Sequence, residues 1–260
     1  MALPRVQAFE FNDQPWVPAV LRDTIVEALS RTLVWGRMLD GLVDPLASFL
    51  ERAGTREVLD LGSGAGGPAE IVLGAFERRG LPLSITLTDL FPRPEVWRPL
   101  ATRHGGSLHF VESSVDATKI PAELSRGRAR TIINVLHHLP EPLARGVIES
   151  AIEDRAPIFV AEGFERNPLT FAAFAPVGIP ALALSPIISK NRRLARAVLT
   201  WATPIAILAS TWDGIVSTLR VYTEDELLDM AGRDPSYEWR YGIYRYKPFG
   251  HGYYFYGIPR

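Results

Sequence analysis

The sequence of 260 residues contains no cysteine. Disulfides, thiolate metal ligands and a cysteine nucleophile are therefore excluded, and any chemistry has to use other groups. A strong excess of either charge is also absent, because 28 basic residues nearly balance 29 acidic ones. Without a net positive field to attract phosphates, nucleic acid is not an expected partner.

Several short patterns are absent as well. Residues 1–13 lack a basic head followed by an apolar run, so they do not predict a secretory signal, and we expect a cytoplasmic protein. No Gly-x-Ser-x-Gly occurs, which argues against a hydrolase. Histidines and carboxylates do not recur at metal-ligand spacing, so no metal is expected. The 47% hydrophobic content that is present is ample for a continuous core.

The order of predicted elements indicates an α/β protein. Apolar residues recur at helical spacing through residues 15–53, and the last helix there has Asp44 as a candidate cap, Pro45 in its first turn and Gly54 after its end. Strands and helices then alternate, with a helix expected at 68–79. The expected strands lie at 57–61, 84–89, 108–112, 130–134 and 158–162. Such alternation predicts a parallel sheet with helices on both faces.

The C-terminal region completes this sheet. Thr223 and Glu226 have the spacing of a capping box and open a helix that runs through Met230. Two aromatic-rich strands follow, at 237–246 and 253–258, separated by a turn that contains proline and glycine. They predict an antiparallel hairpin at the sheet edge, which brings the expected total to seven strands.

An apolar insertion lies between the fifth strand and the capped helix, at residues 167–222. Its stretches 169–189 and 197–212 carry no charge. The first is long enough for a membrane span of about 20 residues. It contains three prolines, however, and the second stretch contains Pro204. Prolines at this spacing favour short broken helices over one continuous rod.

A glycine loop follows the first strand, with the sequence Asp60-Leu61-Gly62-Ser63-Gly64-Ala65-Gly66. Glycines allow a tight turn and a close approach of backbone to ligand, and they also fit the looser pattern of dinucleotide-binding folds. Asp60 distinguishes a cofactor that carries an ammonium group from one that carries a pyrophosphate, since its carboxylate attracts the ammonium group and repels the pyrophosphate. At about 4 Å and an effective dielectric of about 20, that contact is roughly 4 kcal/mol in either direction.

The loop resembles the Asp-x-Gly-x-Gly-x-Gly loop of class I S-adenosylmethionine-dependent methyltransferases. The resemblance covers about residues 54–165 and implies a Rossmann-like fold that binds S-adenosylmethionine and releases S-adenosylhomocysteine. It implies that Asp60 and the loop residues form the cradle for the methionine part. Those loop residues are Gly62, Ser63, Gly64 and Gly66.

Three later positions fit the same resemblance. Asp89 ends the second strand and would accept hydrogen bonds from the ribose hydroxyls, while Leu90 or Phe91 would pack against adenine. After the third strand, Asp116 would receive the adenine amino group and the Ala117 amide would face the ring. The backbone of Asn134, after the fourth strand, would pass beneath the cofactor.

The segment after Asn134 resembles the family's segment beside the transferred methyl group and contains His137 and His138. A neutral imidazole is a suitable proton acceptor near pH 7 if the acceptor is a hydroxyl. Because adjacent side chains generally point in different directions, we expect one base, with His137 preferred and the other histidine structural.

The acceptor is expected to be small and largely apolar, such as a polyketide, isoprenoid, fatty or aromatic metabolite of secondary metabolism. This expectation rests on charge-free, aromatic-bearing segments, which equally suit a helical core or a homodimer interface. The aromatic residues are Trp16, Trp35, Phe171, Phe174, Trp201 and Trp212.

The chain is accordingly divided into four segments: an N-terminal helical lid at 1–53, the cofactor-binding core at 54–166, the insertion as a cover over the acceptor at 167–222, and a helix and hairpin that complete the core at 223–260. Two other functions stay open. One is a membrane-associated or protein-binding module that uses the insertion as its surface. The other is a nicotinamide-dependent reductase, which Asp60 disfavours.

Overall fold

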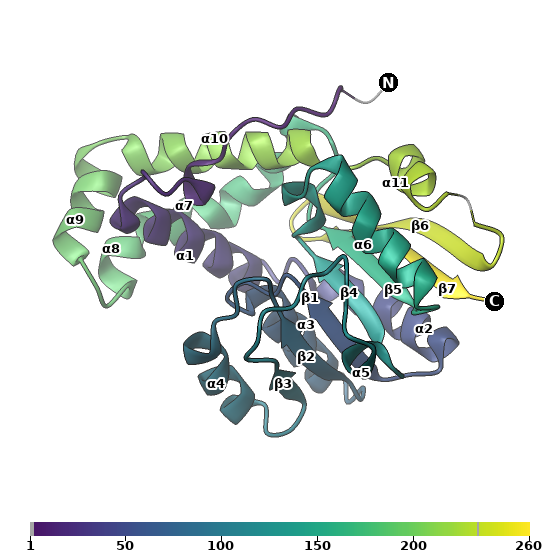
Figure 1. Cartoon of the computed structure of the whole chain (residues 1–260). Helices are drawn as coiled ribbons and strands as arrows, with labels where there is room; N and C mark the ends of the chain where they lie inside the picture. The colour runs from purple at the N-terminus through teal and green to yellow at the C-terminus, as the bar shows by residue number, and fades with distance from the viewer. Residues whose placement is uncertain (1–2, 233) are drawn as a thin grey trace. The chain divides into compact units, whose positions relative to one another are not determined.

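The structure is a computed structural model that describes residues 3–232 and 234–260 (Figure 1). It consists of two compact units, each built from separate parts of the chain. The unit that we call the sheet unit comprises Leu39–Gly163, Tyr222–Tyr244 and Gly252–Arg260. The second, the helical unit, comprises Met1–Met38, Phe164–Val221 and Arg245–His251.

The sheet has seven strands in the order β3-β2-β1-β4-β5-β7-β6. The first five strands are mutually parallel, and β7 runs antiparallel to β5. This confirms the predicted parallel sheet with a C-terminal antiparallel hairpin. The strands are β1 (Glu57–Leu61), β2 (Ser84–Thr88), β3 (Leu108–Phe110), β4 (Ala129–Ile133), β5 (Ile158–Glu162), β6 (Tyr237–Tyr246) and β7 (Gly250–Pro259).

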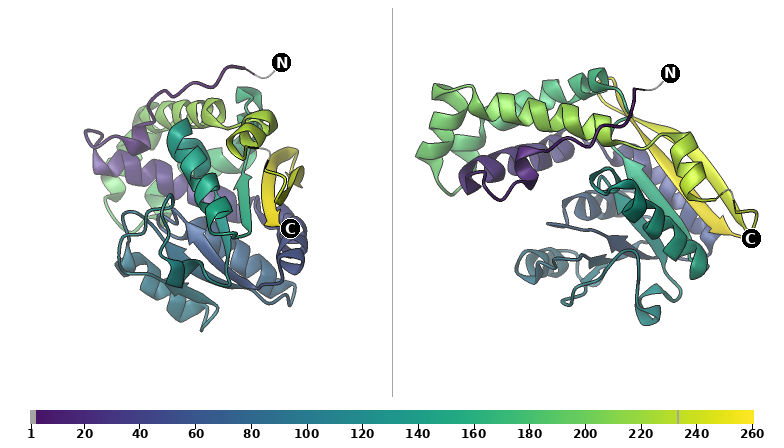
Figure 2. Two further views of the ribbon diagram at one scale, coloured as in Figure 1. Left: turned by 45° about the vertical axis from the view of Figure 1, so that its right-hand side comes forward. Right: turned by 45° about the horizontal axis from the view of Figure 1, so that its top comes forward.

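Helices cover both faces of this sheet, which explains why every residue of β4 and β5 is buried. Figures 1 and 2 show α6 on one face and α2 on the other. The helices of the sheet unit are η2 (Asp40–Leu42), α2 (Val43–Ala53), α3 (Gly67–Arg78), α4 (Pro94–Arg103), α5 (Ala122–Ser125), η3 (Leu136–His138), α6 (Glu141–Glu153) and α11 (Glu224–Met230).

The helix ends follow the sequence with one exception. Gly54 adopts φ +68° at the end of α2, and the capping box of α11 forms between Thr223 and Glu226. The predicted cap at Asp44 is wrong, because α2 begins at Val43 and Asp44 lies inside its first turn. There Asp44 accepts a hydrogen bond of 2.6 Å from the Arg79 side chain. The sequence pattern of the helix does not predict this contact.

The insertion forms several short helices rather than one rod, as its prolines predict. Among the described residues no single helix is long and apolar enough to cross a membrane, whereas Arg193–Ala202 and Ile205–Arg220 meet the criterion together but are bent by 78°. The helical unit contains η1 (Phe11–Asp13), α1 (Ala19–Trp35), η4 (Pro168–Phe174), α7 (Ala175–Ala183), α8 (Ser185–Ile188), α9 (Arg193–Ala197), η5 (Val198–Ala202) and α10 (Ile205–Arg220).

Buried charges join the N-terminal segment to α10 inside the helical unit. Arg220 pairs with the fully buried Glu10 at 2.8 Å. Asp213 accepts hydrogen bonds from the amides of Phe11 and Asn12 at 2.6 and 3.0 Å. Burial raises the pKa of Asp213 to about 6, while these amides oppose the rise. The division into compact units thus groups α1 with the insertion and α2 with the sheet. The roles expected for the four segments, as lid, cofactor-binding core, acceptor cover and completion of the core, stay a prediction.

Candidate active site

The glycine loop between β1 and α3 has three residues in the left-handed region, Gly62 at φ +68°, Gly64 at +53° and Gly66 at +80°. A Cβ at Gly62 would lie 2.8 Å from Val135, and one at Gly66 would lie 2.9 Å from Leu100. Among the residues that the structure describes, nothing lies within 4 Å of the Cβ position at Gly64. Two glycines are therefore required by conformation and packing together, whereas Gly64 presents an open backbone face.

Asp60 lies at the end of β1 beneath this loop and is buried. Its Oδ2 accepts a hydrogen bond from the Ser63 hydroxyl at 2.6 Å, and its Oδ1 accepts one from the Thr131 hydroxyl at 2.9 Å. Burial raises the pKa of Asp60 to about 6, the two hydroxyls oppose the rise, and the nearby Asp89 adds to it. The carboxyl group therefore changes its charge close to neutral pH, and a neighbouring cation would favour its ionised form.

Asp89 follows β2 and contacts the same loop. Its Oδ2 accepts a hydrogen bond of 2.8 Å from the amide of Gly64, and its Oδ1 accepts one of 2.8 Å from the amide of Phe91. The side chains of Leu90 and Phe91 are exposed, that of Phe91 by 77%. Asp60 and Asp89, which end neighbouring parallel strands, thus meet at residues 63 and 64 of one loop.

The loop that carries Asp116 is joined to the same edge of the sheet. The Ser114 hydroxyl donates a hydrogen bond of 2.6 Å to the carbonyl oxygen of Leu90. The amide of Val115 donates one of 2.9 Å to the backbone carbonyl oxygen of Asp89. Asp116 itself is exposed, and its Oδ1 accepts hydrogen bonds from the hydroxyl and amide of Thr118, which lower its pKa. Asp116 and Ala117 are therefore next to the Asp89 turn, where the sequence predicts adenine contacts.

Asn134 connects the carboxyl ends of β4 and β5. Its backbone has φ +57°, its amide donates to Ala161 at 2.8 Å, and its side-chain oxygen accepts a hydrogen bond of 2.7 Å from the amide of Gly163. A non-glycine residue in the left-handed region is uncommon, and asparagine tolerates it better than most residues. The side chain therefore fixes the sharp turn that leads into the two histidines.

His137 is buried on η3 and is held at two points by the fully buried Glu162 at the end of β5. The Nδ1 of His137 lies 2.7 Å from one carboxylate oxygen of Glu162, and its amide donates to the other at 3.1 Å. A carboxylate at Nδ1 favours the tautomer in which Nδ1 carries the proton. Nε2 is then the ring nitrogen with the lone pair.

The expectation that the two histidine rings diverge is wrong. The ring centroids of His137 and His138 are only 4.1 Å apart, with 36° between the ring planes. The physical reason is local, because η3 is a tight 3₁₀ turn and His137 is drawn inward by Glu162. His138 is half-buried, so it is the more accessible ring of the pair.

Three residues at this site were not predicted. They are Glu162, Thr131, which bonds Asp60, and Trp97, whose indole N–H donates to the carbonyl of Gly64 at 3.0 Å. Glu162 had a usable sequence signal, since it is an acid at the carboxyl end of an apolar strand, as are Asp60 and Asp89. Thr131 and Trp97 are set by strand register and helix packing, which the sequence does not encode locally.

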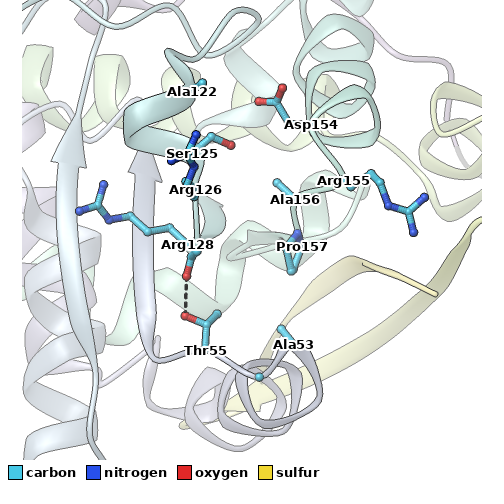
Figure 3. A pocket seen from close by; sticks show the side chains of 12 residues that line it. Ala53, Thr55, Ala122, Ser125, Arg126, Arg128, Asp154, Arg155, Ala156 and Pro157 are labelled. Atoms are coloured by element: carbon cyan, nitrogen blue, oxygen red, sulfur yellow. Dashed lines mark hydrogen bonds between the residues drawn. The ribbon is translucent and has the colours of Figure 1, made fainter.

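A separate cavity of about 450 Å³ lies at the opposite edge of the sheet, next to the segments that precede β1, β4 and β5 (Figure 3). The side chains of Arg128 and Arg155 extend in different directions there, toward carbonyl groups of Leu124 and Arg260. The charges of Arg128 and Arg155 therefore do not converge on one point of this cavity.

The helical unit contains an apolar pocket of about 300 Å³. Phe171 and Phe174 stack at a centroid distance of 5.4 Å beside it, and a Cβ at Gly214 of α10 would overlap the ring of Phe171. Thr32, Ser210 and Thr211 are its polar lining residues. Of the six aromatic residues that the sequence analysis names, Phe171 and Phe174 line this pocket, whereas the four tryptophans, Trp16, Trp35, Trp201 and Trp212, are exposed.

Comparisons with known proteins identify the fold. No family model matches the sequence, and no curated protein matches it. The solved structure of the S-adenosylmethionine-dependent methyltransferase SibL aligns with a TM-score of 0.53 at 12% identity, over 87% of this chain and 56% of its own. The O-methyltransferase NcsB1 of neocarzinostatin biosynthesis aligns with a TM-score of 0.50 at 17% identity, over 91% and 58%.

The methyltransferase domain of bacterial CtHen1 aligns with a TM-score of 0.49 at 14% identity, over 85% of this chain and 99% of that domain. The present chain spans a little over half of the length of SibL and NcsB1. The strand order and the antiparallel β7 agree with the resemblance found in the glycine loop. The chain has the fold of the class I S-adenosylmethionine-dependent methyltransferases.

Proposed function

We propose that this protein transfers the methyl group of S-adenosylmethionine to a small, largely apolar acceptor. One observation carries the proposal: the carboxylates of Asp60 and Asp89, from two neighbouring strands, both engage the loop at Ser63 and Gly64. A buried acid beside a bare backbone face suits an ammonium group, and an acid after the next strand suits a ribose.

The residues present fit this cofactor. Gly64 leaves its face open, and its backbone is fixed by Asp89 on the amide side and by Trp97 on the carbonyl side. The exposed Phe91 offers a flat apolar surface for adenine. S-adenosylmethionine, when bound, supplies a methyl group activated by the positive sulfonium. The protein then has to bind, orient and exclude water, which provides much of the rate in an in-line displacement.

His137 is proposed as the general base for a hydroxyl acceptor. Glu162 holds its Nδ1 and, as a buried carboxylate, would stabilise the imidazolium that forms when Nε2 takes the acceptor proton. Glu162 acts through His137 and is therefore a positioning residue. His138 lies against the ring of His137 and is the second candidate base.

An apolar acceptor is supported by the helical unit, whose pocket of about 300 Å³ is lined mostly by apolar side chains. A volume in this range suits a small organic molecule. NcsB1, which shares the fold, was solved with S-adenosylmethionine and 2-hydroxy-5-methyl naphthoic acid bound. We therefore place the acceptor among hydroxylated aromatic or polyketide-like metabolites.

Calorimetry with S-adenosylhomocysteine tests the proposal on the intact chain. We expect one site per chain with micromolar affinity, and transfer of labelled methyl from S-adenosylmethionine to a member of a panel of hydroxylated aromatic compounds. Absent or millimolar binding would overturn the cofactor assignment. Binding without transfer to any apolar acceptor, but with transfer to polar ones, would overturn the acceptor class alone.

A further inference from the structure

The segment of the helical unit that carries α8 and α9 combines exposed apolar side chains with cations. We call residues 185–197 the α8–α9 tip, and Figures 1 and 2 show it at the end of the helical unit where α10 begins. Ile187 is 57% exposed and Leu194 is 82% exposed. Lys190 and Arg193 lie between them in sequence and are also exposed.

Acidic residues are missing from this part of the chain. No aspartate or glutamate occurs from Asn167 to Trp212, although Lys190, Arg192, Arg193 and Arg196 all lie in that stretch. Two acids of α1 face these cations, Asp23, whose carboxylate is 3.8 Å from Arg192, and the partly exposed Glu27, which is 2.7 Å from Arg196. The tip therefore carries an excess of positive charge, while the whole chain is nearly neutral.

The tip is fixed to α1 by a partly buried ion pair. Arg196 is buried and pairs with Glu27 of α1 at 2.7 Å, and it also donates to the carbonyl of Asn191 at 3.1 Å. The Ser189 hydroxyl donates to the same Glu27 at 2.5 Å. These contacts occupy the polar groups of Arg196 and Ser189 on the side of the tip that packs against α1. The outer side is left with aliphatic side chains and long cationic ones in a defined arrangement.

We propose that the α8–α9 tip binds the surface of an anionic phospholipid membrane. Exposed aliphatic side chains can enter the boundary between headgroups and acyl chains, while lysine and arginine reach the phosphate and carboxylate groups. Trp201 of η5, the element that follows α9, is 58% exposed and adds a side chain that favours such boundaries. The inference is independent of the methyl transfer.

Attachment at the surface fits better than insertion of the bent helix pair α9–η5 and α10. Arg196, Asp213 and Arg220 on these helices are buried, and each is bonded to a partner within the helical unit. Moving them into lipid would break these contacts and place charges in hydrocarbon. Only the tip and Trp201 are therefore assigned to the membrane.

Vesicle flotation with the full chain tests this surface. We expect the protein to float with vesicles that contain phosphatidylserine, to float poorly with phosphatidylcholine alone, and to dissociate as salt is raised. Lys190→Glu with Arg193→Glu should weaken the binding about tenfold or more. Leu194→Ser should weaken it less, since it removes only one apolar side chain.

Arg245→Glu with Lys247→Glu is the matched control. These exposed cations lie on β6 and on the turn after it, the pair changes the net charge equally, and exposed Phe249 lies beside them. Circular dichroism melts establish that all variants fold. Equal loss in the control would overturn the assignment of the tip, as would unchanged binding of the tip variant. Dimerisation that Leu194→Ser abolishes, without vesicle binding, would overturn it in favour of a second copy.

Discussion

The amide of Gly64 donates a hydrogen bond of 2.8 Å to Oδ2 of Asp89, across 25 residues of sequence. This bond joins the end of β2 to the glycine loop after β1, so the proposed ribose-binding acid also shapes the proposed cradle for the methionine part. Any change at Asp89 is therefore expected to affect two parts of the proposed cofactor site at once.

Asp89→Ala should weaken binding of S-adenosylhomocysteine by about 10- to 100-fold. The carboxylate would otherwise accept hydrogen bonds from ribose hydroxyls, and hydrogen bonds to a charged group contribute about 1.5–3 kcal/mol. Calorimetry at pH 7.5 measures the effect. Asp234→Ala is the matched control, because Asp234 accepts the amide of Ser236 at 2.7 Å as Asp89 accepts that of Phe91. Equal affinity of the two variants would remove Asp89 from the site.

Gly64→Ala should abolish cofactor binding at a small cost in stability. No described residue lies within 4 Å of the new Cβ, so the protein has room for it, and the substitution introduces only the strain at φ +53°. That strain costs about 1–2 kcal/mol. The methyl group would, however, occupy the space proposed for the cofactor.

Gly80→Ala supplies the comparison for this loss. Gly80 has φ +65°, and no residue in the described part of the chain lies within 4 Å of its Cβ position, but it follows α3 and is away from the site. Both variants should show similar decreases in Tm, whereas only Gly64→Ala should lose binding of S-adenosylhomocysteine. If Gly64→Ala binds as well as Gly80→Ala, the cofactor does not pass over this loop.

Most of the sheet could be predicted from the sequence, because alternating apolar strands and helix-ending glycines are local signals. The bounds of β1 and β5 agree with the prediction, while β3 is shorter than expected and ends at Phe110. The positions of Asp60 and Asp89 follow from strand ends meeting at one edge of a parallel sheet.

The contacts of the buried polar groups were much less predictable. The bond from Thr131 to Asp60 spans 71 residues and depends on the register between β1 and β4. The close approach of the rings of His137 and His138 depends on the 3₁₀ turn and on the hydrogen bond between His137 and Glu162. Such features arise from tertiary packing, which no short stretch of sequence specifies.

His137→Ala should lower kcat by about 10²- to 10⁴-fold for a hydroxyl acceptor and leave the affinity for S-adenosylhomocysteine nearly unchanged. Glu162→Gln should lower kcat by roughly 10- to 100-fold, because a neutral amide does not stabilise the imidazolium. KM for S-adenosylmethionine should change little in both variants. Steady-state kinetics with methyl transfer as readout measures these values.

The exposed His109 on β3 provides the control for the histidine prediction. His109→Ala removes the same functional group outside the proposed site and should retain full activity. A His137→Ala variant with unchanged kcat would exclude His137 as the base. In that case His138→Ala tests the neighbouring ring, which lies 4.1 Å away.

Cofactor binding should weaken below pH 6 because of Asp60. Burial raises the pKa of Asp60 from 3.8 to about 6, so the folded protein binds this proton more tightly than the unfolded chain does. The contribution of Asp60 to stability is therefore largest below pH 4 and declines as the pH rises to about 6. Ligand binding has the opposite dependence, since an ammonium group beside Asp60 favours the ionised carboxylate and returns its pKa toward the ordinary value.

From these two pKa values, affinity for S-adenosylhomocysteine should be about tenfold lower at pH 5 than above pH 7, and binding at pH 6 should release about half a proton. Calorimetry in two buffers with different ionisation enthalpies measures both. Asp60→Asn should bind more weakly at pH 7.5 and lose the dependence between pH 5 and 7. An affinity that is constant over this range in the unmodified protein would show that no cation binds next to Asp60.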